Sequence, residues 1–134
     1  MTERVQKALE NHKKGMNCAQ AVACAFADAV GMDEATLFKV SEGFGAGMGG
    51  MKCTCGAVSG AILLAGLKNS SGTPENPTKA RTYQLSKEIT NTFEKMNGSV
   101  ICRELKGVET KKVLRTCDGC IEDAAKIAEA ILGL

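Results

Sequence analysis

Cysteine is the residue type in this sequence best suited to carry chemistry, and six of the seven cysteines fall at or near the start of a predicted helix. They occupy four segments of the chain: Cys18, Cys53 with Cys55, Cys102, and Cys117 with Cys120. A helix start presents free N–H groups and a partial positive charge, which favour a thiolate over a thiol. The thiolate is the form that binds metals and attacks disulfides. If the four helix starts converge, their sulfurs form one site.

Two of the four segments offer two candidate sulfurs each. The Cys117-x-x-Cys120 spacing suits a shared metal or a redox dithiol, and Cys53-x-Cys55 can also serve one metal or cluster. Cys24 differs, because it lies about 120° around its predicted helix from Cys18, at about 100° per residue. We expect Cys24 to be a small buried hydrophobe.

A site built from these sulfurs would suit two chemistries. One is a reversible dithiol/disulfide. The other is a thiophilic metal held almost wholly by thiolates, because the single histidine, His12, lies among polar residues and is expected at the solvent edge of a helix. Such a ligand set favours an iron–sulfur cluster or zinc. The sequence has no Ser/His/Asp set and no paired carboxylates near the apolar core, so it does not support hydrolysis or acid–base catalysis. Whether the protein is an enzyme stays open.

A glycine-rich stretch, residues 43–60, surrounds the second cysteine segment. It contains a GxGxxG motif, but no strand is predicted before it and no acidic residue between Glu42 and Glu75 could hold a ribose, so nucleotide binding is disfavoured. We expect the glycines to let the backbone pass close to the cysteines and to offer N–H groups to sulfur or to a cofactor. The glycines expected in this role are Gly47, Gly49, Gly50 and Gly56.

Apolar residues recur at helical spacing along most of the chain, and no stretch alternates as a strand would. The predicted helices cover residues 3–14, 18–30, 34–42, 56–67 and 78–96, a short helix capped by Ser99 that holds Cys102, and a last helix that follows the Cys117–Cys120 motif. Thr2, Asn17 and Asp33 are the predicted caps of the first three helices, and Gly98 is the predicted stop of the fifth. We predict an all-α fold, a single domain over residues 1–134 with about five to seven helices. The small-residue helix from Gly56 to Leu67 should lie at its centre.

The composition of the chain bears on nucleic-acid binding, membrane insertion and cellular location. The 17 basic and 15 acidic residues are mixed along the chain, without the basic block that nucleic-acid binding requires. The longest uncharged apolar stretch, residues 56–67, is too short to span a bilayer, so a membrane-embedded protein is not expected. The odd number of cysteines and the absence of an apolar signal at the start predict a reducing, cytoplasmic location.

The cysteines and their neighbours resemble a known family over nearly the whole chain. The matching segments are Asn17–Val22, the glycine-rich loop, Cys55–Gly60 with the motif CGAxxG, Gly98–Leu105, and Cys117. They are similar to the C_GCAxxG_C_C family of redox-active proteins, which is often encoded beside transporter genes. The resemblance implies four hallmark cysteines: Cys18, Cys55, Cys102 and Cys117. Cys24, Cys53 and Cys120 lie outside that pattern.

We therefore expect a redox or metal site with the four hallmark cysteines as its primary sulfurs. Cys53 and Cys120 are expected as additional ligands or resolving thiols. An electron-transfer or thiol partner, with a transport system among the candidates, follows from the resemblance. Two competing hypotheses are a non-enzymatic metal-binding or metal-sensing module associated with transport, and a structural role in which the cysteines only pack a core.

Overall fold

Seven α-helices and one π-helical turn make up the structure, a computed structural model that describes residues 1–134. In chain order they are α1 (Glu3–Lys13), α2 (Cys18–Cys24), α3 (Glu34–Glu42), η1 (Gly47–Met51), α4 (Gly56–Asn69), α5 (Lys79–Asn97), α6 (Cys102–Lys106) and α7 (Cys117–Leu132). No strand is present, and the only β-type pairing is one antiparallel bridge between Thr54 and Ile101. The prediction of an all-α fold is confirmed.

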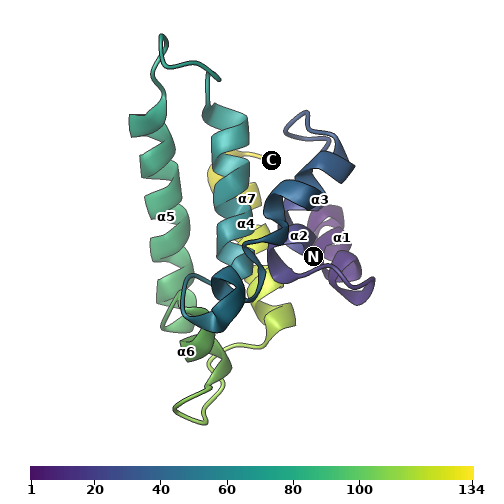
Figure 1. The fold of residues 1–134 in the computed structure, drawn as a ribbon, viewed down its shortest axis with the longest axis vertical. Coiled ribbons are helices and arrows are strands. Elements are labelled where there is room, and N and C mark those ends of the chain that lie inside the picture. Colours follow the sequence, from purple (N-terminus) through teal and green to yellow (C-terminus); the bar gives the residue numbers. More distant parts are fainter.

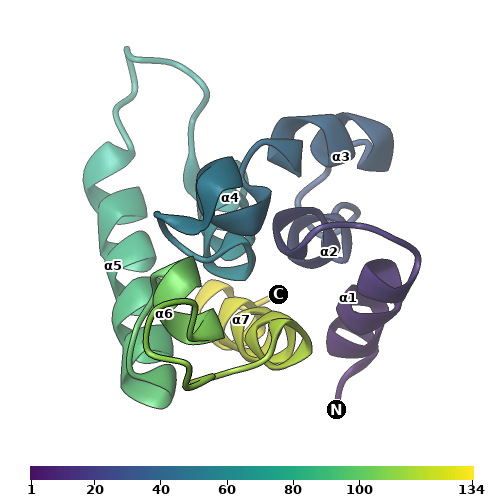
Figure 2. The ribbon, with the colours of Figure 1, turned by 60° about the horizontal axis from the view of Figure 1, so that its bottom comes forward.

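Helix α4 lies at the centre of the bundle, as its small and apolar residues predict. It packs against α2, α5 and α7, and these helices surround it in Figures 1 and 2. The first six residues of α4, Gly56 to Ala61, are all buried. The main core cluster draws its side chains from both ends of the chain, including Val5 of α1, Ile89 of α5 and Ile121 of α7. From Gly56 to Leu67 α4 carries no charge on any face, and such a helix is stable only when its neighbours cover it in this way.

Side-chain caps fix where four of the helices begin. The caps are Thr2, Asn17, Asp33 and Thr116, and each accepts a hydrogen bond from the backbone N–H three residues further on. Such a bond satisfies one of the N–H groups that a helix start leaves free. The first three caps were predicted from the sequence and are confirmed. Gly98, the predicted stop of α5, ends that helix in the left-handed region with φ +85°.

One predicted helix is too long. The sequence predicts a helix over residues 18–30, but α2 ends at Cys24 and the chain continues as turns. The amide of Phe26 bonds to the carbonyl of Ala23, three residues back instead of four. This tighter turn closes the α-helix early while its apolar residues still enter the core.

The start of α6 is also set differently from the prediction. Ser99 does not cap this helix; its hydroxyl accepts a 2.9 Å hydrogen bond from the amide of Ile101 and donates one of 2.6 Å to the carboxylate of Glu104. The residue before α6 is Ile101, which takes part in the bridge with Thr54. The bridge therefore fixes where α6 begins.

The cysteine-bearing segments gather at one end of the molecule. Figure 1 shows η1, α6 and the beginning of α7 at its lower end, opposite the loop of residues 70–78, and Figure 2 turns this end forward. Helix α6 packs against η1 there. None of the helices combines the length and the apolar character that crossing a membrane requires.

Candidate functional site

A small cavity of about 20 Å³ lies where the beginnings of α2, α4, α6 and α7 meet. Five of the seven cysteines line it: Cys18, Cys55, Cys102, Cys117 and Cys120. They stand at the first residue of α2, the residue before α4, the first residue of α6, and the first and fourth residues of α7. The four helix starts thus converge on one place.

Close backbone contact between α2 and α4 brings Cys18 beside Cys55. A Cβ atom on Gly56 would lie 3.3 Å from the Cβ of Cys18 and 3.1 Å from the amide nitrogen of Ala19. One turn further along α4, a Cβ on Gly60 would lie only 2.7 Å from the carbonyl oxygen of Ala19. Glycine at these two positions therefore sets the distance between the two helices.

The bridge between Thr54 and Ile101 carries Cys102 to the same cavity. The amide of Cys55 donates a 2.7 Å hydrogen bond to the carbonyl of Val100, and the amide of Cys102 donates one of 2.9 Å to the carbonyl of Cys53. These two bonds lock the chain before α4 against the chain before α6.

A carbonyl of α6 holds the segment that leads to the last two cysteines. The oxygen of Leu105 accepts hydrogen bonds from the amides of Leu114, at 2.8 Å, and Arg115, at 3.3 Å. Arg115 in turn donates to both carboxylate oxygens of Asp123 on α7, at 3.0 and 3.2 Å. The start of α7 is thereby fixed to α6, and Cys117 and Cys120 face the cavity.

Four of the five thiols interact as two pairs, Cys18 with Cys117 and Cys55 with Cys120. A hydrogen bond from the Cys18 thiol lowers the pKa of Cys117, and the same bond raises the pKa of Cys18. Likewise, a hydrogen bond from Cys120 lowers the pKa of Cys55 and raises that of Cys120. Each pair therefore favours one thiolate beside one thiol.

Two further groups stabilise the thiolates. The ammonium of Lys106 also hydrogen-bonds Cys117, which contributes to its lowered pKa and raises the pKa of Lys106. At Cys55 the backbone N–H groups of Ala57 and Val58, at the start of α4, lower the pKa further. Cys102 has no such donor, and burial raises the pKa of its thiol.

The two pairs differ in access from solvent. Cys18 and Cys117 are half-buried, whereas Cys55, Cys102 and Cys120 are 3–5% exposed. A reagent or partner in solution therefore meets the Cys18–Cys117 pair before it meets the inner pair.

A family model described as "Putative redox-active protein (C_GCAxxG_C_C)" matches residues 16–131 of the chain. The chain belongs to this family. No curated protein and no solved structure matches it. In this member of the C_GCAxxG_C_C family, the four cysteines that the sequence resemblance singles out all line the cavity, and Cys120 joins them.

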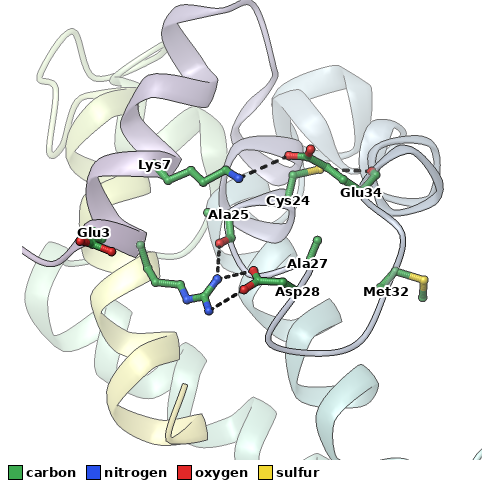
Figure 3. A pocket seen from close by; sticks show the side chains of 9 residues that line it. Glu3, Lys7, Cys24, Ala25, Ala27, Asp28, Met32 and Glu34 are labelled. Carbon is green, nitrogen blue, oxygen red and sulfur yellow. Dashed lines mark hydrogen bonds and ion pairs between the residues drawn. The ribbon is translucent and has the colours of Figure 1, made fainter.

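The remaining two cysteines lie outside the cavity. Cys24 is 1% exposed and belongs to a separate small core cluster, so the prediction of a buried hydrophobe is confirmed. Figure 3 shows Cys24 beside a surface pocket. Its sulfur lies 3.9 Å from the carbonyl oxygen of Glu34. The ion pairs Lys7–Glu34 and Arg4–Asp28 lie at the same pocket. Cys53 is exposed at the surface, where it does not line the cavity.

The predicted glycines divide into two kinds. Gly56 contacts α2 as described, and a Cβ atom on Gly47 would lie 2.5 Å from the Cβ of Cys102. In contrast, Gly49 and Gly50 are exposed, and a Cβ on either would meet no heavy atom within 4 Å. The amides of Ala57 and Val58 belong to α4, so the N–H groups that reach the Cys55 sulfur come from that helix.

Two charged side chains beside the thiols were not foreseen: Lys106 and Arg115 line the cavity. His12 is at the surface as expected, but its Nδ1 is 2.7 Å from a carboxylate oxygen of Asp118, the residue after Cys117. The protonated form of His12 favours the Cys117 thiolate. The one sequence feature that hints at the His12–Asp118 contact is the position of Asp118 directly after Cys117.

The thiols are chemically suitable as metal ligands, but their positions do not form a metal site. Thiolates are suitable ligands for zinc or an iron–sulfur cluster. However, no three Cys, His, Asp or Glu side chains converge in a way that could hold a metal ion as they stand. The sulfurs are arranged two by two around a cavity of about 20 Å³, roughly one water-sized sphere.

Proposed function

We propose that this C_GCAxxG_C_C family protein carries out thiol–disulfide exchange through Cys18 and Cys117. The observation that carries the proposal is the contact between these two half-buried thiols at the starts of α2 and α7, with Lys106 beside Cys117. A dithiol needs one thiolate as nucleophile and a second thiol close enough to complete the exchange. A cytoplasmic setting, where dithiols are kept reduced, suits such a cycle.

The reaction oxidises the pair and reduces a disulfide of a partner protein or small molecule. The Cys117 thiolate attacks one sulfur of the partner disulfide, a mixed disulfide forms, and the other partner sulfur leaves as a thiolate. Cys18 then gives up its proton to that thiolate and attacks the Cys117 sulfur. The Cys18–Cys117 disulfide forms, the second partner thiolate leaves and takes a proton from water, and two electrons have passed to the partner.

The inner pair, Cys55 and Cys120, is proposed as a second dithiol. It lines the same cavity but is closed to solvent, so we expect it to exchange with the outer pair and not directly with a partner. Cys102 lines the same cavity as a fifth thiol.

A thiolate-bound metal or iron–sulfur cluster is the second candidate. It is favoured by one observation, the presence of five cysteines around a single cavity. Binding would require the sulfurs to move from their paired positions, and the ligands would come from Cys18, Cys55, Cys102, Cys117 and Cys120. Such a centre would supply electron transfer, or it would serve metal sensing in a transport system.

Anaerobic purification followed by metal, sulfide and thiol analysis separates the two candidates. For the dithiol we expect metal-free protein with seven titratable thiols when reduced, and the thiols of both Cys18 and Cys117 should be lost on treatment with oxidised glutathione. Peptide mapping should then locate the new disulfide at Cys18 and Cys117. Brown protein with stoichiometric iron and sulfide would favour the cluster and contradict the dithiol proposal.

Serine variants provide the matched control. In Cys117→Ser, Cys18 should keep its thiol under the same treatment, whereas Cys24→Ser, which changes a cysteine outside the cavity, should still lose the Cys18 and Cys117 thiols. Equal loss in both variants would contradict the assignment of Cys117 as nucleophile.

A further inference from the structure

Cys53 does not line the cavity, but the backbone holds it opposite Cys102, which does line the cavity. Thr54 and Ile101 form the antiparallel bridge, and the two flanking hydrogen bonds join Cys102 to Cys53 and Cys55 to Val100. In this register, Cys53 and Cys102 are directly opposed residues of an antiparallel pair. In a regular ladder, opposed side chains lie on one face. Here the pairing is a single bridge, and Cys102 is buried at the start of α6 whereas Cys53 is exposed.

The spacing of opposed residues suits a disulfide. Directly opposed Cα atoms in antiparallel pairs are about 4.5–5.5 Å apart. Disulfides join Cα atoms about 4.4–6.8 Å apart. The register and the hydrogen bond from the Cys102 amide to the Cys53 carbonyl therefore favour a backbone separation that a disulfide can span.

Gly47 supplies a second, independent observation at the same place. A Cβ atom on Gly47 would lie 2.5 Å from the Cβ and 3.3 Å from the sulfur of Cys102, and 3.0 Å from the carbonyl oxygen of Cys53. Any larger residue would overlap the Cys102 side chain and press against the Cys53 backbone. The glycine therefore lets the two cysteine-bearing segments pack against η1 in their bridged register.

The two cysteines also differ sharply in exposure. Cys102 is 3% exposed and lines the cavity together with the Cys18–Cys117 pair. Cys53 is exposed, in a segment that carries Lys52 as its only charged residue between Gly43 and Leu67. One member of the pair thus faces solvent and the other faces the cavity thiols.

We propose that Cys53 and Cys102 form a reversible disulfide that carries electrons between a low-molecular-weight thiol in solution and the thiols of the cavity. Cys53 is the sulfur that the external thiol reaches, and Cys102 is the sulfur that exchanges with the cavity pair. This relay rests on the proposed thiol–disulfide function of Cys18 and Cys117, but the Cys53–Cys102 bond can form without it.

The external half of the relay reduces the Cys53–Cys102 disulfide. A thiolate of the small molecule attacks the Cys53 sulfur, the bond to Cys102 breaks, and Cys102 leaves as a thiolate. A second thiolate attacks the small-molecule sulfur of the mixed disulfide and releases Cys53. The small molecule leaves as its own disulfide, and its two electrons remain on Cys53 and Cys102. Cys53 takes a proton from water, and Cys102 stays a thiolate.

The internal half passes these electrons on without any further reagent. The Cys102 thiolate attacks the Cys117 sulfur of the oxidised Cys18–Cys117 pair, and Cys18 leaves as a thiolate that takes the proton from Cys53. The Cys53 thiolate then attacks the Cys102 sulfur, and Cys117 leaves as a thiolate. The net result is one disulfide at Cys53 and Cys102 and a reduced cavity pair.

The test maps disulfides after equilibration with oxidised and reduced glutathione and rapid alkylation. Trypsin cleaves after Lys52 and Arg103, so the proposed bond joins peptides 53–68 and 96–103. Because peptide 53–68 also contains Cys55, fragmentation must assign the link to Cys53. We expect this linked pair in wild type and in Cys24→Ser, and its loss in Cys53→Ser. A link to Cys55, or no link, overturns the proposal.

Kinetics test the relay itself. The rate at which glutathione reduces the Cys18–Cys117 disulfide should fall about tenfold in Cys53→Ser, because the accessible sulfur is gone, and should be unchanged in Cys24→Ser. Circular dichroism checks the fold, which an exposed Cys→Ser change should preserve. Equal rates in all three proteins overturn the relay. If the Cys18–Cys117 disulfide never forms while the Cys53–Cys102 bond does, the proposed function fails and the new disulfide stands.

Discussion

Gly60 of α4 lies directly against Ala19 of α2, so closely that a Cβ atom on Gly60 would be 2.7 Å from the Ala19 carbonyl oxygen. Ala19 follows Cys18, and Gly60 lies five residues after Cys55. This contact therefore sets the separation of the two helices that carry the first two thiols of the cavity.

Gly60→Ala should destabilise the protein and disturb the thiol site together. The added methyl group must push α2 away from α4, at a cost of about 1–3 kcal/mol in the free energy of unfolding. Urea unfolding measures this cost, and the yield of the Cys18–Cys117 disulfide measures the disturbance. Gly66→Ala is the control, because a Cβ there meets no heavy atom within 4 Å. It should raise stability by about 0.5–1 kcal/mol through helix propensity.

Gly47→Ala tests the other close approach. The residue has φ +56°, and its Cβ would clash with Cys102. We expect a loss of about 1–3 kcal/mol from backbone strain, with added cost from the overlap. Gly50→Ala, in the same turn but open to solvent, should change the free energy of unfolding by less than about 0.5 kcal/mol. Equal effects at the two positions would contradict the packing seen around Cys102.

The reactivity of Cys117 should depend on pH differently in the folded and unfolded protein. The Cys18 thiol and Lys106 favour the thiolate, so the pKa of Cys117 lies below the ordinary value of about 8.5. In the folded protein, alkylation of Cys117 by iodoacetamide should already be near its maximum at neutral pH and should fall as the pH drops through the lowered pKa. In guanidinium, the rate should instead rise about 25-fold between pH 7 and pH 9. Coincident profiles would show that the fold does not activate this thiol.

Lys106→Met should slow the alkylation of Cys117 at pH 5. Loss of the cation raises the pKa of Cys117 from about 5, so at this pH a smaller fraction is thiolate and the rate falls about three- to tenfold. Peptide-resolved mass spectrometry after a short pulse of iodoacetamide measures the rate at this one cysteine. Lys111→Met removes an exposed lysine from the segment that follows α6 and should leave the rate unchanged.

Much of the fold could be predicted from local sequence patterns. Caps at Thr2, Asn17 and Asp33 and the stop at Gly98 are encoded within a few residues of the helices they bound, so these boundaries agree with the structure. The early end of α2 could not be predicted, because its apolar periodicity continues past Cys24 while the backbone tightens into turns. The start of α6 was missed because a bridge to a distant segment sets it.

The sequence by itself determined that the thiols stand at helix starts and that a central helix of small residues lies between them. Both properties are local, since they depend on spacing, caps and side-chain size. Only the tertiary structure decided that Cys18 pairs with Cys117 and Cys55 with Cys120, and that Cys53 stays outside, opposite Cys102. These relationships depend on contacts between residues far apart in the chain, made by the close approach of α2 to α4 and by the bridge before α6. No periodicity along the sequence encodes such contacts.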